Sequence, residues 1–204
     1  EAAVRCTGIE CPAKLFRNLV HFVSREAMDI SGLGENIIQQ LLDNHLIKNI
    51  ADIYTLKFED IASLKKNGKK FAQNLVDAIE RSKQNDLSKL ITALGIRHVG
   101  VKASKMLAKK YKAMENLMQA SYDELSMIDD IGPIVAGSIR EFFLEDQTID
   151  LIQKLKIAGV NMKSLEAENE DNRFEGKTFV LTGSLEEFTR NEASEIIEKF
   201  GGKT

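Results

Sequence analysis

The stretch LITALGIRHVGVKASKMLAKK, residues 90–110, predicts two helices joined by a tight hairpin. Two glycines, Gly95 and Gly100, mark a short break between two apolar segments. After the break, Ala103 and Leu107 recur at the spacing of one helix face. A hairpin of this kind is the unit around which the rest of the chain is organised.

Three other stretches align with this one when each is placed on its second glycine, at intervals of 34, 32 and 32 residues. An apolar residue lies four positions before each glycine, and others lie three and seven positions after it, as on the buried face of a helix. The residue directly before the glycine is also apolar, except at Asn67. The second and fourth stretches agree further upstream, which predicts a doubled two-repeat unit. The regular period indicates four repeats, centred on Gly34, Gly68, Gly100 and Gly132.

The repeated unit resembles the helix-hairpin-helix element, whose geometry suits a phosphate. Glycine tolerates positive φ and, without a Cβ, lets another molecule approach the backbone closely. We therefore expect the turn geometry to fail if Gly100 is replaced by valine. The helix that follows offers unpaired N–H groups and the positive end of its dipole to an anion. Contacts of this kind predict binding to duplex DNA that is salt-sensitive and independent of base sequence.

The charge of the chain is −3 in total but unevenly distributed. Residues 57–110 hold 13 Lys or Arg against 5 Asp or Glu, a surplus of +8, so the remainder carries −11. The basic residues gather beside the second and third glycines, whereas Glu35 follows Gly34 and two aspartates precede Gly132. A solvated basic helix face is the alternative explanation for any single lysine. The candidate DNA-binding residues are Gly32, Gly34, Lys65, Lys66, Gly68, Lys69, Lys70, Arg97, His98, Gly100, Lys102, Lys105 and Gly132.

Cys6 and Cys11 are the only cysteines, in the sequence RCTGIECPAK. Two thiolates on a tight loop can form half of a tetrahedral zinc site, which needs four ligands. On their own they are equally compatible with free thiols or a disulfide. His21 is a poor third ligand, and neither His21 nor His98 has a nucleophile beside it in the sequence, so we expect no acid–base chemistry from them.

The composition excludes several classes of protein. No apolar run approaches the ~20 residues of a membrane span, and the first residues do not resemble a signal peptide. Tryptophan is absent and aromatic residues make up 6%, which disfavours a platform that stacks single-stranded bases. The sequence therefore predicts a soluble protein without membrane contact.

The last forty residues predict a change of fold. Residues 164–173, SLEAENEDNR, are polar and acidic and read as a linker. The segment FEGKTFVLTGSL then predicts a strand over Thr178–Thr182, and Thr189 with Glu192 predicts a capping box at the start of a helix that ends before Gly201 and Gly202. This order resembles the opening of a BRCT domain, in which a second parallel strand follows. Because the domain is incomplete, we expect the segment to be disordered or docked against another copy.

The order of these parts resembles the C-terminal half of bacterial NAD-dependent DNA ligases, and the resemblance spans the whole chain. It implies a mainly α fold, a tandem helix-hairpin-helix array with an incomplete α/β BRCT start at the C-terminus. The expected domains are the second half of a four-cysteine zinc finger (1–14), four helix-hairpin-helix repeats (15–163), the acidic linker (164–173) and a truncated BRCT domain (174–204).

The resemblance also implies a role in sealing nicks. Cys6 and Cys11 would be the second pair of zinc ligands, and the hairpins would grip the duplex on both sides of a nick. The parent enzyme would join a 3′-hydroxyl to a 5′-phosphate in DNA replication and repair, with NAD supplying AMP and Mg²⁺ bound in domains that this chain lacks. The adenylated lysine of such ligases lies in a K-x-D-G motif that is absent from the chain, so we expect the fragment alone to be inactive.

Other assignments remain open at this stage. Helix-hairpin-helix arrays also serve as protein-interaction scaffolds, and tandem hairpins occur in nuclease or junction-binding subunits of DNA repair. We expect the fragment to be a monomer in the bacterial cytoplasm, associated with the nucleoid. The exposed sheet edge of the truncated BRCT part could cause artefactual association.

Overall fold

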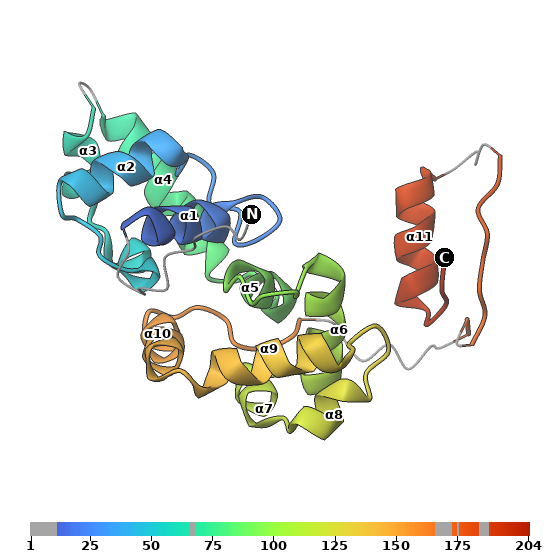
Figure 1. The fold of residues 1–204 in the computed structure, drawn as a ribbon. Helices are drawn as coiled ribbons and strands as arrows, with labels where there is room; N and C mark the ends of the chain where they lie inside the picture. Colours follow the sequence, from blue (N-terminus) through green and yellow to red (C-terminus); the bar gives the residue numbers. More distant parts are fainter. Residues whose placement is uncertain (1–11, 66–67, 166–172, 175, 184–187) are drawn as a thin grey trace, which may run out of the picture. The chain divides into compact units, whose positions relative to one another are not determined.

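The computed structural model describes residues 12–65, 68–165, 173–174, 176–183 and 188–204. The chain divides into two compact units, residues 1–165 and 166–204 (Figure 1). In the described residues no helix is long and apolar enough to cross a bilayer. The helices of the first unit are α1 (Pro12–Val23), α2 (Glu35–Asp43), the 3-10 helix η1 (Ile50–Thr55), α3 (Phe58–Ser63), α4 (Lys69–Ser82), α5 (Leu87–Ala93), α6 (Val101–Tyr111), α7 (Met114–Gln119), α8 (Tyr122–Ser126), α9 (Pro133–Leu144) and α10 (Asp146–Ile157).

Four pairs of consecutive helices correspond to the four predicted repeats. The pairs are α1 with α2, α3 with α4, α5 with α6 and α8 with α9, and the two helices of each pair pack against each other. We call the connections hairpin 1 (residues 29–34), hairpin 2 (64–68), hairpin 3 (95–100) and hairpin 4 (127–132). The prediction of a mainly α fold built from helix-hairpin-helix repeats is confirmed.

The positions that the repeat pattern assigns to the core are buried. The residue seven places after each repeat glycine is Leu41, Leu75, Leu107 or Ile139, and all four side chains are almost fully inaccessible to solvent. They belong to one continuous cluster that runs through the whole first unit. The apolar period of the sequence therefore identified the faces along which the helices pack.

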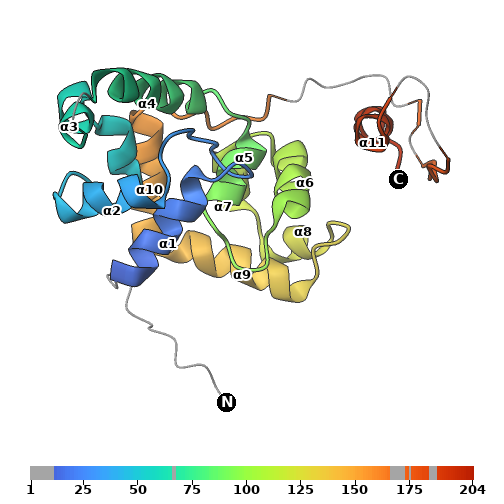
Figure 2. The same cartoon turned by 90° about the horizontal axis from the view of Figure 1, so that it is seen from above.

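Helix α1 connects the first repeat to the third. It packs on α2, on η1 and on α5, and both views show it beside α5 (Figures 1 and 2). His21 on α1 places its Nε2 2.8 Å from the carbonyl oxygen of Thr92 near the end of α5. The role of His21 is therefore structural.

The segment after α10 joins the two halves of the first unit. Asn161 donates from its backbone N–H to the carbonyl of Lys83 (2.8 Å) and from Nδ2 to the carbonyl of Asn85 (2.9 Å), in the link between α4 and α5. The N–H of Ser164 donates to the carbonyl of Lys112, and that of Leu165 to the carboxylate of Asp86. Ser164 and Leu165, which the sequence assigned to the linker, are thus hydrogen-bonded within the first unit.

The second unit begins an α/β arrangement. Helix α11 (Arg190–Lys199) starts with the predicted capping box between Thr189 and Glu192. An isolated parallel bridge joins Thr178 to Lys203, the order expected for two strands on either side of a helix. A β-strand needs several consecutive ladder pairs. Among the described residues, 178–182 take part in this single bridge, so the strand predicted there is not formed.

A small aromatic cluster fixes the second unit locally. The ring of Phe174 lies edge-on to Phe179 and to Phe200, with centroids 5.0 and 5.8 Å apart. Gly202 fits against this cluster, because a Cβ there would lie 2.6 Å from Cγ2 of Ile197. Close packing therefore requires glycine at position 202, whereas Gly201 has a positive φ of 84°.

Asp86 holds two elements of the first unit at once. Its carboxylate accepts from the Ser88 N–H at the start of α5 (2.8 Å) and from the Leu165 N–H (2.6 Å). Partial burial alone would raise the pKa of Asp86, but these hydrogen bonds outweigh burial and lower it below its ordinary value. Such a carboxylate stabilises the fold above the ordinary pKa of about 3.9, and this stabilisation is lost as the pH falls through the lower pKa of the folded state.

We predict that replacing Asp86 with alanine lowers the free energy of unfolding by about 1 kcal/mol at neutral pH, because a helix cap and a tie to residue 165 are lost. The difference from the unmodified chain should shrink below about pH 4. Urea unfolding followed by circular dichroism at several pH values measures both effects. Asp77→Ala is the control, since Asp77 is exposed and accepts from Gln73 one turn away. An equal loss for both variants, or a constant difference at all pH values, would contradict the assignment.

Candidate nucleic-acid interface

Hairpins 1, 3 and 4 share one backbone geometry. In each, the N–H of the apolar residue before the repeat glycine donates to the carbonyl three residues earlier. The bonds join Leu33 to Ile30, Val99 to Ile96 and Ile131 to Ile128, at 3.2, 3.0 and 3.0 Å. The residue directly before the glycine is buried in all three, so each turn is anchored in the core.

The positive φ angle of these turns lies two residues before the repeat glycine. Gly32, His98 and Asp130 have φ of 93°, 65° and 63°, the third position of a type II turn. Gly100 has φ −97° and ψ −174°, which any residue can adopt. The expectation that the second glycine is needed for the turn itself was wrong, because the left-handed position is occupied by a different residue.

The repeat glycines of these three hairpins are the N-caps of the helices that follow. Gly34, Gly100 and Gly132 are exposed, have extended backbone angles, and leave open space where a Cβ would lie. The first N–H groups of α2, α6 and α9 have no acceptor within their helix and can bind an anion. In α9 the first residue is Pro133, which has no N–H, so hairpin 4 offers one donor fewer.

Hairpin 2 has a different geometry. Gly68 is buried, has φ −70° and ψ 0°, and donates its N–H to the carbonyl of Lys65 at 3.0 Å. A Cβ on Gly68 would lie 2.4 Å from the carbonyl oxygen of Ala62, so the packing itself requires glycine. Lys66 and Asn67 lie outside the described residues. The Gly68 amide is already used within the protein, unlike the amides that open the other three helices.

The basic side chains at hairpin 2 are exposed nevertheless. Lys65, Lys69 and Lys70 all face solvent at the adjoining ends of α3 and α4. The Nζ of Lys65 lies 3.9 Å from the ring centroid of Phe71, a cation–π contact that holds the ammonium group at the surface. Hairpin 2 therefore offers positive charge without a free glycine amide.

Hairpin 3 combines exposed amides with positive charge. Arg97, His98 and Lys105 are exposed around Gly100. Lys102, in the first turn of α6, forms an ion pair with Asp130 of hairpin 4, with Nζ and Oδ2 2.7 Å apart. This pair brings hairpins 3 and 4 together, and nothing in the spacing of the sequence indicated it.

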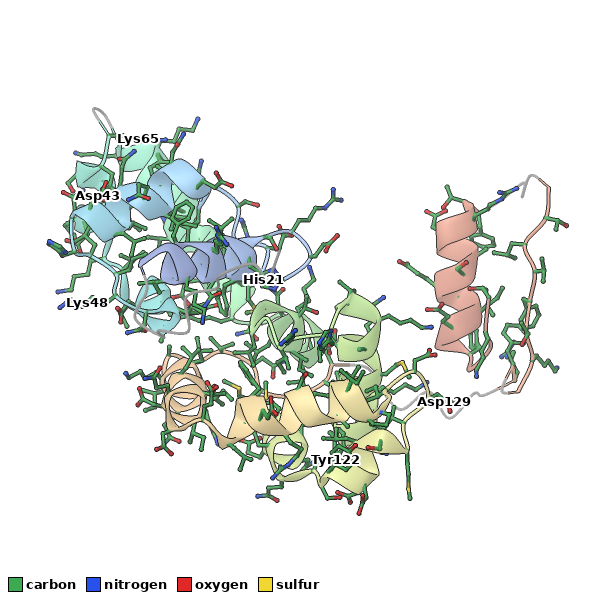
Figure 3. The ribbon with its side chains drawn as sticks, viewed as in Figure 1. His21, Asp43, Lys48, Lys65, Tyr122 and Asp129 are labelled. Atoms are coloured by element: carbon green, nitrogen blue, oxygen red, sulfur yellow. The ribbon has the colours of Figure 1, made fainter. Side chains whose placement is uncertain are left out.

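The structure does not bring all the candidate residues into one cluster. Both ribbon views show hairpin 2 at one end of the first unit and hairpin 4 at the other (Figures 1 and 2). Figure 3 shows the same separation for the labelled side chains of Lys65 and Asp129. A ligand that contacts hairpins 2 and 4 together must therefore be extended, as a duplex is.

A metal site is not seen among the described residues. They contain no group of three or more His, Cys, Asp or Glu side chains that could hold an ion. Cys6 and Cys11, the predicted zinc ligands, lie outside the described part of the chain. Zinc binding by these two thiols stays a prediction.

We predict that the two glycines of hairpin 1 respond differently to substitution. Gly32→Ala should lower the free energy of unfolding by about 1 kcal/mol, because a side chain at φ 93° is strained. Gly34→Ser should leave stability unchanged, because its backbone angles are ordinary, the space is open and serine is a good N-cap. Urea unfolding of the two variants checks this, and an equal loss at both positions would contradict the turn geometry.

The chain matches three protein families in part. Residues 24–81 match the family described as SAM-like helix-hairpin-helix tandem, and residues 89–152 match the helix-hairpin-helix motif family. Residues 169–204 match the BRCA1 C Terminus (BRCT) domain. The two helix-hairpin-helix matches each cover one pair of repeats, in agreement with the doubled two-repeat unit seen in the sequence.

The chain is also similar over its whole length to proteins named DNA ligase. It is 52% identical over 203 residues to DNA ligase of Thermoanaerobacter pseudethanolicus, 50% over 207 residues to that of Acetivibrio thermocellus, and 47% over 205 residues to that of Clostridioides difficile. These matches cover 100% of the chain but 31%, 31% and 30% of the respective relatives. The chain thus spans less than a third of the length of these relatives, and the matches together fit a fragment of a DNA ligase with helix-hairpin-helix and BRCT segments.

Proposed function

We propose that this chain binds the sugar-phosphate backbone of duplex DNA without regard to base sequence. The observation that carries the proposal is the set of three exposed N-cap glycines, Gly34, Gly100 and Gly132. The fold does not need glycine at any of them, since their backbone angles are ordinary and an added Cβ would meet no atom. Glycine at the same place in three repeats, where the fold does not need it, points to a molecule outside the fold.

A phosphate is the group that such a glycine would admit. An oxygen bound to the first helical amides must come within about 3 Å of their nitrogens. A side chain on the N-cap residue would stand in the path of the phosphate at that distance. Three repeats of one chain have glycine at this same place, and each lies where the helix dipole favours an anion.

The charges indicate which hairpins would bind most strongly. Hairpin 3 has exposed amides and exposed cations together, and hairpin 2 supplies lysines. Hairpin 1 is followed by Glu35, and hairpin 4 contains Asp129 and Asp130 just before Gly132, so we expect these two hairpins to contribute less. A duplex lying across hairpins 2 and 3 would meet the basic block of residues 57–110.

In the longer protein, this binding would serve nick sealing. The relatives are named DNA ligase. We propose that the whole protein joins a 3′-hydroxyl to a 5′-phosphate during replication and repair, with NAD as AMP donor and Mg²⁺ in other domains. Cys6 and Cys11 would supply two zinc ligands. The chain contains no K-x-D-G motif, so its part is to hold and align the ends, a contribution of orientation.

The proposal further places the whole protein in the cytoplasm, associated with the nucleoid. It assigns nicked double-stranded DNA as the partner and a monomer as the working state. The alternative from another class is a protein-interaction scaffold. A DNA titration distinguishes the DNA-binding chain from the scaffold. A DNA-binding chain should show a salt-dependent affinity that falls when surface lysines are replaced, whereas the signal of a scaffold should not change.

We predict that the 204-residue chain binds nicked and intact duplexes of one sequence, and that Gly100→Ser weakens this binding about tenfold. The serine can occupy the amides that would bind phosphate, and a charge-assisted hydrogen bond is worth about 1.5 kcal/mol or more. Fluorescence anisotropy measures the affinity, and thermal unfolding shows that the fold is kept. Gly137→Ser, inside α9 with open space around it, is the matched control. If the chain does not bind at low salt, the scaffold alternative is preferred.

A second prediction concerns hairpin 2. Lys69→Glu combined with Lys70→Glu should lower the affinity and reduce the slope of log affinity against log salt by about 1 to 2, because each lost phosphate contact releases about one counterion fewer. Lys14→Glu combined with Lys48→Glu, at exposed positions outside the hairpins, is the control with the same change in net charge. Figure 3 shows Lys48 and Lys65 at separate places in the same half of the first unit. An equal change in slope for the control would mean that hairpin 2 has no special part in binding.

A further inference from the structure

A histidine occupies the turn of hairpin 3, at a place where hairpins 1 and 4 have residues that cannot become cations. Gly32, His98 and Asp130 hold the left-handed position of these three turns, with φ of 93°, 65° and 63°. Histidine is one of the few residue types with a side chain that tolerate this backbone conformation. An imidazole ordinarily titrates at about pH 6.5. Hairpin 3 therefore has a group at its turn that can gain a positive charge near neutral pH.

His98 lies close to the amides that open α6. It is exposed, and Gly100, the N-cap of α6, follows two residues later. Because consecutive Cα atoms are about 3.8 Å apart, the Cα atoms of His98 and Gly100 lie within about 7.6 Å of each other. Charges interact over ~10 Å at an ionic strength of about 0.1 M. A phosphate bound at the start of α6 is therefore within the electrostatic range of His98.

The other charged side chains around this turn come from hairpin 3 itself, from the first half of α6 and from hairpin 4. They are Arg97, Lys102, Lys105, Asp129 and Asp130. Lys102 and Asp130 form an ion pair, with Nζ and Oδ2 2.7 Å apart. Arginine, lysine and aspartate ordinarily keep their charge between about pH 5.5 and 7.5, whereas histidine does not. A phosphate bound among these groups adds negative charge, which favours the protonated imidazole.

His21 is a second histidine near hairpin 3. Its ring lies against the first residue of the turn, because a Cβ on Gly95 would stand 3.5 Å from Cδ2 of His21. The Nε2–H group of His21 donates to the carbonyl of Thr92 at 2.8 Å. This nitrogen is thus used in the packing of α1 on α5. His98 is the histidine that lies beside the proposed phosphate site.

We propose that His98 links duplex binding to proton uptake: the imidazole takes a proton from solvent when a phosphodiester binds beside Gly100. The inference rests on the proposed function and adds a pH dependence to it. The affinity is highest where His98 is already protonated before DNA binds, and it falls as the pH rises and the imidazole becomes neutral. At higher pH, binding at hairpin 3 depends on Arg97, Lys105 and the helix amides.

Proton linkage has two measurable signatures. A cation and a phosphate about 4 Å apart in water attract each other enough to raise the affinity about fivefold. One more phosphate contact also makes the slope of log affinity against log salt steeper by up to about 0.9. Both effects should be present at about pH 5.5 and absent at about pH 7.5, because histidine ordinarily titrates between these values.

The test is the affinity of the 204-residue chain for an intact duplex, measured by fluorescence anisotropy at fixed ionic strength and at several pH values. The duplex has 5′-hydroxyl ends, because a terminal phosphate has a second pKa of about 6 and would itself titrate. The unmodified chain should bind about fivefold more tightly at about pH 5.5 than at about pH 7.5. His98→Asn should bind equally at both, with the affinity that the unmodified chain has at the higher pH. Asparagine tolerates the left-handed angle, so the turn is kept.

His45→Asn is the matched control. His45 is exposed just beyond the end of α2, outside the four hairpins, and it also has a left-handed backbone, with φ 55°. The substitution removes an imidazole from the same conformation at a different place. It should leave the pH dependence of binding at about fivefold. Circular dichroism of the unmodified chain and both variants at each pH shows that the fold is kept.

Four results would overturn the proposal. If the unmodified chain binds DNA equally tightly at all pH values, no proton is taken up, while the proposed function stands. If His98→Asn keeps the full pH dependence, the proton is bound at another residue. If His98→Asn lowers the affinity by one factor at every pH, His98 contacts DNA as a neutral group. If the unmodified chain binds no duplex at any pH, both the proton linkage and the proposed function fail.

Discussion

Burial of a single apolar residue before the repeat glycine is the constraint on which hairpins 1, 3 and 4 depend. Leu33, Val99 and Ile131 are inserted into the core, and their amides close the turns behind them. The glycine that follows each of these buried residues lies at the surface, and it is the N-cap of the next helix. In hairpin 2 the sequence has Asn67 at this place, and there the glycine is buried and its amide is used internally. The hairpin without an apolar residue at this place is thus also the one whose glycine is buried.

The second organising feature is the coupling of two repeat pairs into one unit. Each pair has its own local contacts, but α1 packs against α5, and the segment after α10 bonds to the link between α4 and α5. An exposed ion pair between Lys102 and Asp130 also links hairpin 3 to hairpin 4. A surface made from several hairpins can match a regular ligand only if the hairpins hold fixed distances, and these contacts provide that rigidity.

The sequence predicted the positions of the hairpins and of the buried helix faces, because both follow from a regular spacing of glycine and apolar residues. The glycine spacing located the hairpins, and the apolar positions after each glycine, such as Leu75 and Ile139, proved to be core. It did not predict that the strained angle falls on His98 and Asp130, because both residue types tolerate it and leave no pattern. The pair of Lys102 with Asp130 and the return of Asn161 to Lys83 were also missed. Both are long-range contacts that depend on how the repeats pack, and no spacing in the sequence encodes them.

The return of the segment after α10 has a consequence for the order in which the chain folds. Asn161 and Leu165 form hydrogen bonds with residues 76 and 79 positions earlier in the chain. These bonds therefore close long loops of the first unit. Helix pairs close over short loops and form fast, whereas contacts between distant residues form late. On a ribosome, each repeat pair could fold as it emerges, and α1 could pack on α5 early, but the bonds of Asn161 and Leu165 cannot form until residue 165 has left the exit tunnel. These ties between the repeat pairs are therefore completed only when the whole first unit has been made.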